Sequence, residues 1–240
     1  MSEWFGTWFD SEYYHLLYKD RDYTEAEAFI EKLVEYLNPS KNATIHDLAC
    51  GKGRHSIHLN KLGYTVDGSD YSANSIKQAS LSENDTLHFF EHDMRQPLPK
   101  KYDYIVNLFT SFGYFETDEE HFETLGHIHE GLKDDGIFVF DFMNVDQVLA
   151  NLVPEEMVTK GHIDFDIRRE HKKGKIIKHI TFLDRRIPYH FTEEVAALKS
   201  DKLLQMMKDC GFSLIDVFGN YALEPYDKQG SKRLIMILKK

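Results

Sequence analysis

Apolar and polar positions along the chain predict strands and helices that alternate through the first 145 residues. Short apolar runs bounded by glycine or acidic residues are typical of buried strands, and apolar residues at every third or fourth position are typical of helices. The strands predicted on this basis are 44–49, 64–68, 87–92, 102–109 and 137–142. Because parallel strands joined by right-handed crossovers place helices on both faces, the pattern predicts a Rossmann-like, doubly wound α/β sheet.

Two of the predicted helices carry a recognisable start. Thr24 is followed three residues later by Glu27, and Thr117 by Glu120, and each pair is a capping box at which we expect a helix to begin. The first of these helices is predicted to end before Asn38-Pro39. Further helices are predicted over 54–62 and 72–81.

The pattern changes after residue 145. Period-two alternation over 163–167 and 189–195, with a less regular run over 176–182, predicts antiparallel strands joined by a glycine turn at Gly174. The resulting insertion, 160–197, is longer than an ordinary connection, and we expect it to form a functional lid. A helix at 199–210 and strands at 212–219 and 233–238 follow, and complete a single domain over 1–240.

Composition excludes several classes of protein. The chain has 240 residues with 42% hydrophobic residues, a formal net charge of −11 and two cysteines. The net charge disfavours nucleic-acid backbones, and so few cysteines disfavour a disulfide framework. The first residues have no basic and apolar signal pattern, and the apolar run 136–142 is too short to span a membrane. We therefore predict a cytoplasmic protein with no membrane or nucleic-acid partner.

Candidate chemistry gathers where the predicted strands end. After the first strand comes Asp47-Leu-Ala-Cys-Gly-Lys-Gly53, whose glycines let a backbone approach a ligand. Ser56 replaces the third glycine of a dinucleotide motif, and the Asp47 carboxylate suits an ammonium group better than a phosphate. Asp70, after the second strand, is placed to accept hydrogen bonds from ribose hydroxyls. Asp93 and Met94, after the third, suit an adenine amino group and ring.

With these motifs in this order, the chain resembles the class I S-adenosylmethionine-dependent methyltransferases. The resemblance implies a seven-stranded sheet, mostly parallel with an antiparallel last strand, here 233–238, plus the small antiparallel β insertion. It implies S-adenosyl-L-methionine as the cofactor, with Asp47 near its ammonium group and Leu108 at its methionine end. The predicted cofactor-binding residues are Tyr14, Tyr18, Asp47, Ala49, Gly51, Gly53, Asp70, Tyr71, Asp93, Met94, Leu108 and Phe109.

Within that family the arrangement is similar to small-molecule methyltransferases with a β-rich lid, such as the sugar N,N-dimethyltransferases of macrolide pathways. The fourth motif, Asn-Leu-Phe-Thr at 107–110, lacks the Pro-Pro-aromatic pattern of enzymes that methylate DNA amino groups. We therefore expect methyl transfer to nitrogen or oxygen of a small molecule by in-line displacement. The alternatives are a non-catalytic protein that binds S-adenosylmethionine and a nicotinamide-dependent oxidoreductase.

Seven aromatic residues lie within 4–18 and predict a helical cover over 1–40 that excludes water from the site. The alternative interpretations are a helix pair that caps the core, or a contact between the two copies of a homodimer. His121 and His190 are candidate general bases, although no catalytic residue can be assigned because an activated methyl group needs none in particular. His55-x-x-His58 and His127-x-His129 have no further ligand at metal-binding spacing, so we predict no metal.

Overall fold

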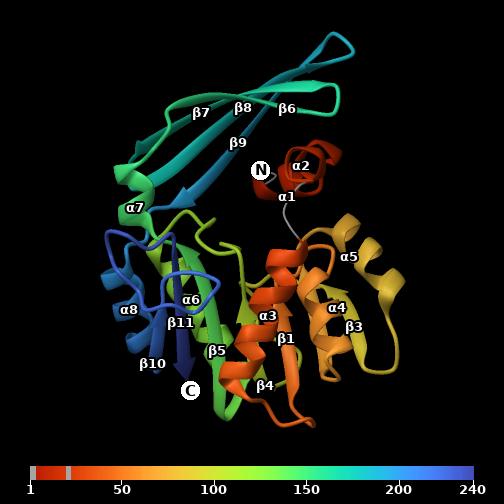
Figure 1. The fold of residues 1–240 in the computed structure, drawn as a ribbon, viewed down its shortest axis with the longest axis vertical. Coiled ribbons are helices and arrows are strands. Elements are labelled where there is room, and N and C mark those ends of the chain that lie inside the picture. Colours follow the sequence, from red (N-terminus) through yellow and green to blue (C-terminus); the bar gives the residue numbers. More distant parts are fainter. Residues whose placement is uncertain (1–3, 20–22) are drawn as a thin grey trace.

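The computed structural model describes residues 4–19 and 23–240 and contains two β-sheets, one above the other (Figure 1). The larger has seven strands in the order β10-β11-β5-β4-β1-β2-β3, and the smaller has four in the order β6-β7-β8-β9. Residues 1–3 and 20–22 of the predicted cover lie outside the described part of the chain.

The seven-stranded sheet is built as the sequence predicts. Its strands are β1 (Thr44–Leu48), β2 (Thr65–Asp70), β3 (Leu87–Glu91), β4 (Tyr102–Asn107), β5 (Leu132–Met143), β10 (Ser213–Phe218) and β11 (Arg233–Lys239). β11 is inserted between β5 and β10 and runs antiparallel to both, while the strands from β5 to β3 are parallel. The carboxyl ends of β1 to β5 therefore meet along one edge of the sheet.

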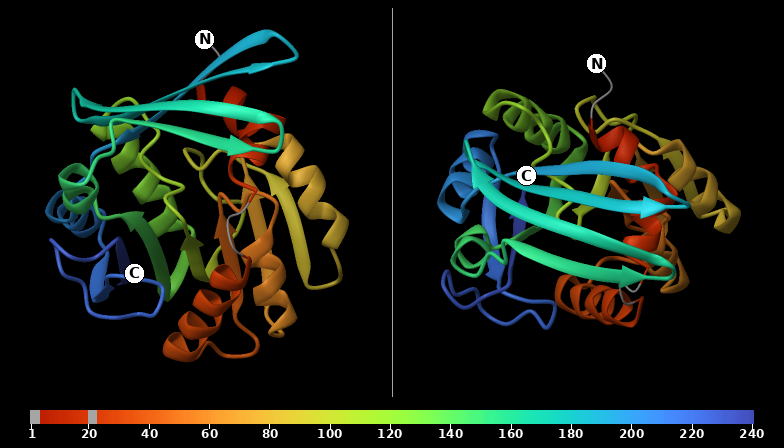
Figure 2. Two further views of the ribbon diagram at one scale, coloured as in Figure 1. Left: turned by 45° about the horizontal axis from the view of Figure 1, so that its top comes forward. Right: turned by 90° about the horizontal axis from the view of Figure 1, so that it is seen from above.

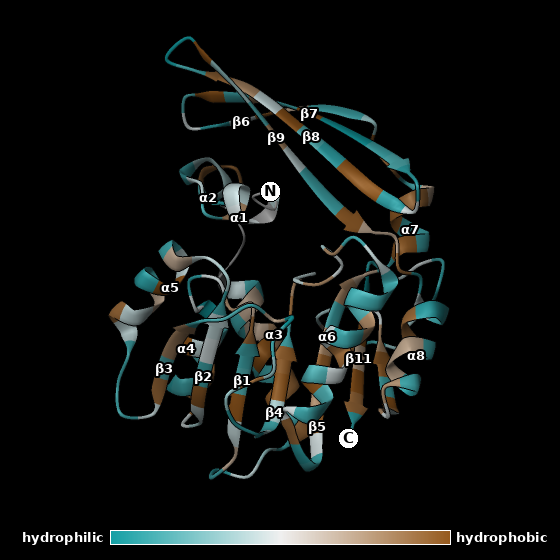
Figure 3. Cartoon of the chain, turned by 180° about the vertical axis from the view of Figure 1, so that it is seen from behind, coloured by the Kyte–Doolittle hydropathy of each residue, from teal (hydrophilic) through white to brown (hydrophobic). Residues whose placement is uncertain are grey.

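Helices cover both faces of this sheet. On one face lie α3 (Tyr23–Leu37), α4 (Arg54–Lys61) and α5 (Ala73–Ala79, followed by a 3-10 turn), and on the other lie α6 (Asp118–Glu130) and α8 (Ser200–Asp209). The strands between them carry apolar side chains on both faces, which appear as hydrophobic bands in the central strands of Figure 3. Phe138 and Phe140 face α6 and α8, whereas Val139 between them faces α3 and α4.

The four-stranded sheet stands over the carboxyl edge of the larger one (Figure 2). Its strands are β6 (Glu155–Lys160), β7 (Ile163–Lys172), β8 (Lys175–Asp184) and β9 (Ile187–Ala196), reached through α7 (Val145–Ala150). At the β7–β8 turn, Lys173 and Gly174 both have positive φ, which matches the right-handed twist of a hairpin. β6 lies outside the predicted range 160–197, because its side chains alternate between exposed and half-buried and give no apolar signal.

The N-terminal aromatic residues form two short helices, α1 (Trp4–Phe9) and α2 (Glu12–Leu17), against the inner face of the four-stranded sheet. Trp8 is fully buried there among Phe165, Ile180 and Phe182. In the described part of the predicted cover, α1, α2 and Tyr18 meet the four-stranded sheet, whereas Phe29 and Leu33 of α3 are buried against the larger sheet.

The two predicted helix starts have different outcomes. Thr117 caps α6 as expected: its side chain accepts from the Glu120 N–H while the Glu120 side chain accepts from the Thr117 N–H. The prediction at Thr24 is wrong, because α3 has already begun at Tyr23 and Thr24 lies inside its first turn.

Candidate active site

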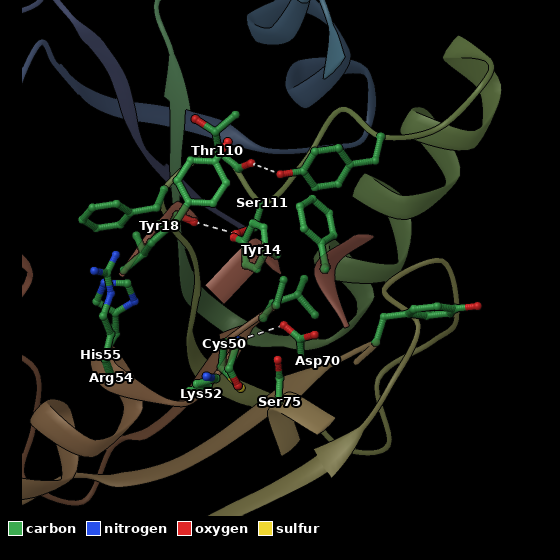
Figure 4. A pocket seen from close by; sticks show the side chains of 18 of the residues that line it. Tyr14, Tyr18, Cys50, Lys52, Arg54, His55, Asp70, Ser75, Thr110 and Ser111 are labelled. Atoms are coloured by element: carbon green, nitrogen blue, oxygen red, sulfur yellow. Dashed lines mark hydrogen bonds between the residues drawn. The ribbon is translucent and has the colours of Figure 1, made fainter. Parts of the chain in front are cut away.

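A cavity of about 910 Å³ lies between the carboxyl edge of the seven-stranded sheet and the four-stranded sheet with its two N-terminal helices (Figure 4). Its lower wall comes from the turns after β1, β2, β3 and β4, and its upper wall from α2 and β9. Most of the residues that the sequence singled out after separate strands therefore line one cavity.

The turn between β1 and α4 depends on left-handed backbone conformations. Ala49, Gly51 and Gly53 all have positive φ, which non-glycine residues adopt rarely. A Cβ on Gly51 would meet no atom within 4 Å, so this glycine leaves open space beside the cavity that it lines. A Cβ on Gly53 would lie 2.7 Å from the Phe89 ring. Gly53 is thus required for packing beneath the turn and does not line the cavity.

Asp70 ties the turn after β1 to the end of β2. Its Oδ2 accepts from the Gly51 N–H at 2.8 Å and its Oδ1 from the Ser72 N–H at 2.8 Å. Burial raises the pKa of this carboxyl above its ordinary value, against the effect of these hydrogen bonds. The Tyr71 N–H also acts on this carboxylate. A carboxylate has about four acceptor positions, so one or two remain for a ligand in the cavity. A pair of neighbouring hydroxyl groups fits this arrangement.

Asp47 lies beneath the turn and not in the cavity. It is 1% exposed, and its Oδ2 accepts from the Ser56 hydroxyl at 2.6 Å. Burial raises its pKa to about 6, although the hydrogen bond from Ser56 acts in the opposite direction. Apart from Asp47 and Gly53, every residue in the predicted cofactor set lines the cavity.

Asp93 and Met94 line the cavity from the end of β3, but the Asp93 carboxylate already has a partner. Arg95 forms an ion pair with it at 2.6 Å. Burial alone would raise the pKa of Asp93, but the hydrogen bonds and charge of Arg95 outweigh burial and lower it. The predicted contact of Asp93 with an amino group would therefore have to share the carboxylate with Arg95.

The turn after β4 is the most strained wall of the cavity. Phe109 and Thr110 have φ of 60° and 63°, and each such non-glycine residue costs on the order of 1–3 kcal/mol, which the surrounding contacts must offset. The Phe109 ring stacks on Tyr221 at 4.7 Å and on His55 at 4.9 Å. The Arg54 guanidinium lies 4.3 Å from the same ring.

Sequence reasoning missed the residues that support this turn, which are Asp141, Tyr221 and Arg233. The Asp141 carboxylate accepts from the Phe109 N–H at 2.7 Å and pairs with Arg233 at 2.7 Å. A signal was present, because Asp141 is the one charged residue in the apolar run 136–142. Tyr221 and Arg233 carry no such signal, since their place depends on β11 returning beside β5.

Glu193 of β9 is the acidic residue that reaches the cavity from the upper wall. Its carboxylate accepts from the Trp8 indole N–H at 2.6 Å and from the Tyr18 hydroxyl at 2.7 Å, and Lys178 lies 3.3 Å away. These contacts join α1, α2 and the four-stranded sheet at one point (Figure 4 shows Tyr14 and Tyr18 facing the cavity). The sequence pattern gave no reason to select this glutamate.

The candidate bases and the cysteine of the turn do not gather as reactive groups. His121 is buried against Phe112 and Phe115, His190 is exposed on β9, and neither lines the cavity. Burial raises the pKa of the Cys50 thiol, so this side chain packs as a neutral group. Within residues 4–19 and 23–240, no three histidine, cysteine or acidic side chains gather as metal ligands would, and no helix is long and apolar enough to cross a membrane.

Comparisons with known proteins agree with the order of these elements. A family model described as a methyltransferase domain matches residues 45–136, from β1 into β5. A glycine/sarcosine N-methyltransferase of Aphanothece halophytica is 25% identical over 229 residues, covering 92% of this chain and 83% of that protein. A dTDP-3-amino-3,4,6-trideoxy-alpha-D-glucopyranose N,N-dimethyltransferase of Streptomyces venezuelae is 30% identical over 135 residues, or 55% and 56% of the two chains.

Among solved structures, an S-adenosylmethionine-dependent methyltransferase from Clostridium acetobutylicum ATCC 824 matches with a TM-score of 0.79 at 18% identity, and 95% of each chain is covered. A likeness at this level of identity concerns the fold. It extends over the seven-stranded sheet and the four-stranded sheet above it.

Proposed function

We propose that this chain, which belongs to the class I S-adenosylmethionine-dependent methyltransferases, methylates an amine nitrogen of a small molecule. Enzyme class and cofactor follow from the family. The acceptor atom, the residues that bind the cofactor and the part played by the upper wall of the cavity are our proposals.

The residues of the lower wall fit the cofactor. Asp70 has acceptor positions left for the ribose hydroxyls, Met94 offers an apolar surface for adenine, and the open space at Gly51 admits the methionine part. Leu108 and Phe109 border the same end from the turn after β4. When bound, S-adenosylmethionine supplies a methyl group activated by its positively charged sulfur.

The upper wall is proposed to exclude water and to shape the acceptor chamber. The insertion and helices α1 and α2 close over the carboxyl edge of the sheet through Trp8, Tyr18 and Glu193. Aromatic rings from Phe9, Tyr14 and Tyr114 line the space below them. Such walls hold the acceptor in line with the methyl group and keep competing water away.

The observation that carries the choice of nitrogen is the Glu193 carboxylate, set among aromatic side chains at the acceptor end of the cavity, where an amine would share it with Trp8, Tyr18 and Lys178. A carboxylate accepts hydrogen bonds from an amine, and aromatic faces attract its cationic form. Glu193 would hold the amine with its lone pair toward the methyl group that the cofactor would supply, S-adenosylhomocysteine would be the leaving group, and the proton of the product ammonium would pass to water. The two relatives above are named as an N-methyltransferase and an N,N-dimethyltransferase.

The test compares acceptors that differ only in the reacting atom: glycine with glycolate, and 3-amino-3-deoxyglucose with glucose, within a wider panel of amines and their hydroxyl analogues. Release of S-adenosylhomocysteine is measured. We expect turnover with amines, and a Glu193→Gln variant with KM for the amine raised roughly tenfold because a hydrogen bond to a charged group is lost. Glu194→Gln is the matched control, since Glu194 pairs with Lys175 and does not line the cavity. Turnover of the hydroxyl analogues alone would refute the choice of nitrogen.

A further inference from the structure

Asp141 is a fully buried carboxylate in the strand that runs beside the cavity. It is 0% exposed, between Phe140 and Phe142 of β5. Four donors reach its carboxylate. Its Oδ1 accepts from Nε and Nη2 of Arg233, and its Oδ2 from the Phe109 N–H and the Tyr221 hydroxyl. A buried charge is tolerated only when it is paired and hydrogen-bonded in this way.

The same residue holds the turn after β4 at two points. The Phe109 N–H donates to the Asp141 carboxylate at 2.7 Å, and the Thr110 N–H donates to the Asp141 backbone carbonyl at 3.0 Å. Both Phe109 and Thr110 are non-glycine residues with positive φ. Their strained conformation thus persists where both of their amide groups are bound by one residue of the neighbouring strand.

Arg233 completes the arrangement from β11. Its Nη2 donates to the Thr110 hydroxyl at 2.9 Å while the guanidinium pairs with Asp141. The register of the antiparallel strand, in which Arg233 lies opposite Met143, brings this side chain to the end of β5. Phe109, Thr110 and Arg233 all line the cavity, so the pair of charges lies directly behind its wall.

We infer that Asp141 and Arg233 are a pair of positioning residues, which fix the Phe109–Thr110 turn so that it binds the methionine end of the cofactor and borders the acceptor chamber. The inference rests on the proposed cofactor site. The antiparallel strand β11 then has a functional role, because it places Arg233 beside the turn. Without the pair, the turn would relax toward ordinary negative φ and move its backbone away from the ligand.

We expect disruption of the Asp141–Arg233 pair to weaken binding of the methionine part of the ligand and to leave binding of its adenosine part nearly unchanged. S-adenosylhomocysteine carries the methionine part, whereas 5′-methylthioadenosine keeps the adenosine part and lacks the amino acid. Calorimetric titration of Asp141→Asn should show affinity for S-adenosylhomocysteine lowered roughly tenfold, and affinity for 5′-methylthioadenosine changed less than about twofold. Asparagine is nearly the same size but cannot neutralise Arg233.

Asp67→Asn is the matched control. Asp67 is also a buried strand carboxylate, 5% exposed, paired with Lys100 at 2.8 Å and with the Tyr102 hydroxyl at 2.7 Å, and it lies outside the cavity. We expect this variant to bind both ligands as the wild type does. If Asp141→Asn does not fold, Arg233→Lys keeps the charge but loses the fork that bridges Asp141 and Thr110, and the same selective loss is expected in smaller degree.

The two titrations distinguish a failure of the proposed cofactor site from a failure of the proposed positioning role. If the wild type binds neither ligand, the cofactor site itself is wrong. If the wild type binds both and the folded variant loses both equally, or loses neither, the positioning role of Asp141 and Arg233 is overturned.

Discussion

Replacement of Asp70 by asparagine is expected to weaken S-adenosylhomocysteine binding by about 100-fold or more. Hydrogen bonds to a charged group contribute about 1.5–3 kcal/mol each, and each 1.4 kcal/mol is tenfold in affinity. The proposed ribose contacts supply two such bonds. An asparagine amide would also face the N–H of Gly51 or Ser72 with an N–H of its own, which disturbs the turn after β1. Isothermal titration calorimetry measures the loss directly.

Glu91→Gln is the control for this experiment. Glu91 lies opposite Asp70 in the register of β2 and β3, is exposed, and does not line the cavity. We expect its affinity for S-adenosylhomocysteine to equal that of the wild type. If Asp70→Asn binds S-adenosylhomocysteine with undiminished affinity, the proposed position of the ribose beside Asp70 is wrong.

The second large effect is expected at Trp8. Its side chain is 1% exposed, its ring lies 4.6 Å from that of Phe191, and its indole N–H donates to Glu193. Truncation of a buried tryptophan to alanine costs about 3–5 kcal/mol. Because Trp8 joins α1 to the inner face of the four-stranded sheet, we expect Trp8→Ala to release α1 and α2, with amide exchange across 4–17 accelerated and methyl transfer reduced on the order of 100-fold.

Trp8→Phe separates packing from hydrogen bonding at the same position. Phenylalanine keeps most of the apolar contact but has no donor for Glu193, so an intermediate effect is expected. Unchanged amide exchange and turnover in Trp8→Ala would contradict the proposal that these helices close the site.

Local patterns in the sequence predicted the larger sheet because its central strands are buried on both faces and the turn after β1 requires glycine. Gly51 and Asp70 could be located because Gly51 lies three residues past β1 and Asp70 is the last residue of β2, and strand ends of a parallel sheet meet at one edge. The order of β11 before β10 in the sheet followed from the family resemblance. Residues placed by a single strand end were therefore predictable.

Residues that reach the cavity through long-range strand pairing could not be predicted from the sequence. Glu193 reaches the cavity because β9 crosses above it, and Arg233 because β11 returns beside β5. The strand β6 was missed because its side chains alternate between exposed and half-buried positions and give no apolar signal. Asp47 was assigned to the cavity from its charge, but its backbone position points the carboxylate beneath the turn, toward Ser56.

A crystal structure of the protein with S-adenosylhomocysteine tests the proposed cofactor site most directly. We expect one molecule in the cavity, its ribose hydroxyls within hydrogen-bond distance of Asp70, its adenine beside Met94, and its homocysteine part between Gly51 and Leu108, with the sulfur facing Glu193 and the aromatic residues of the upper wall. A ligand bound elsewhere, or bound with its sulfur turned away from that chamber, would contradict the proposed site.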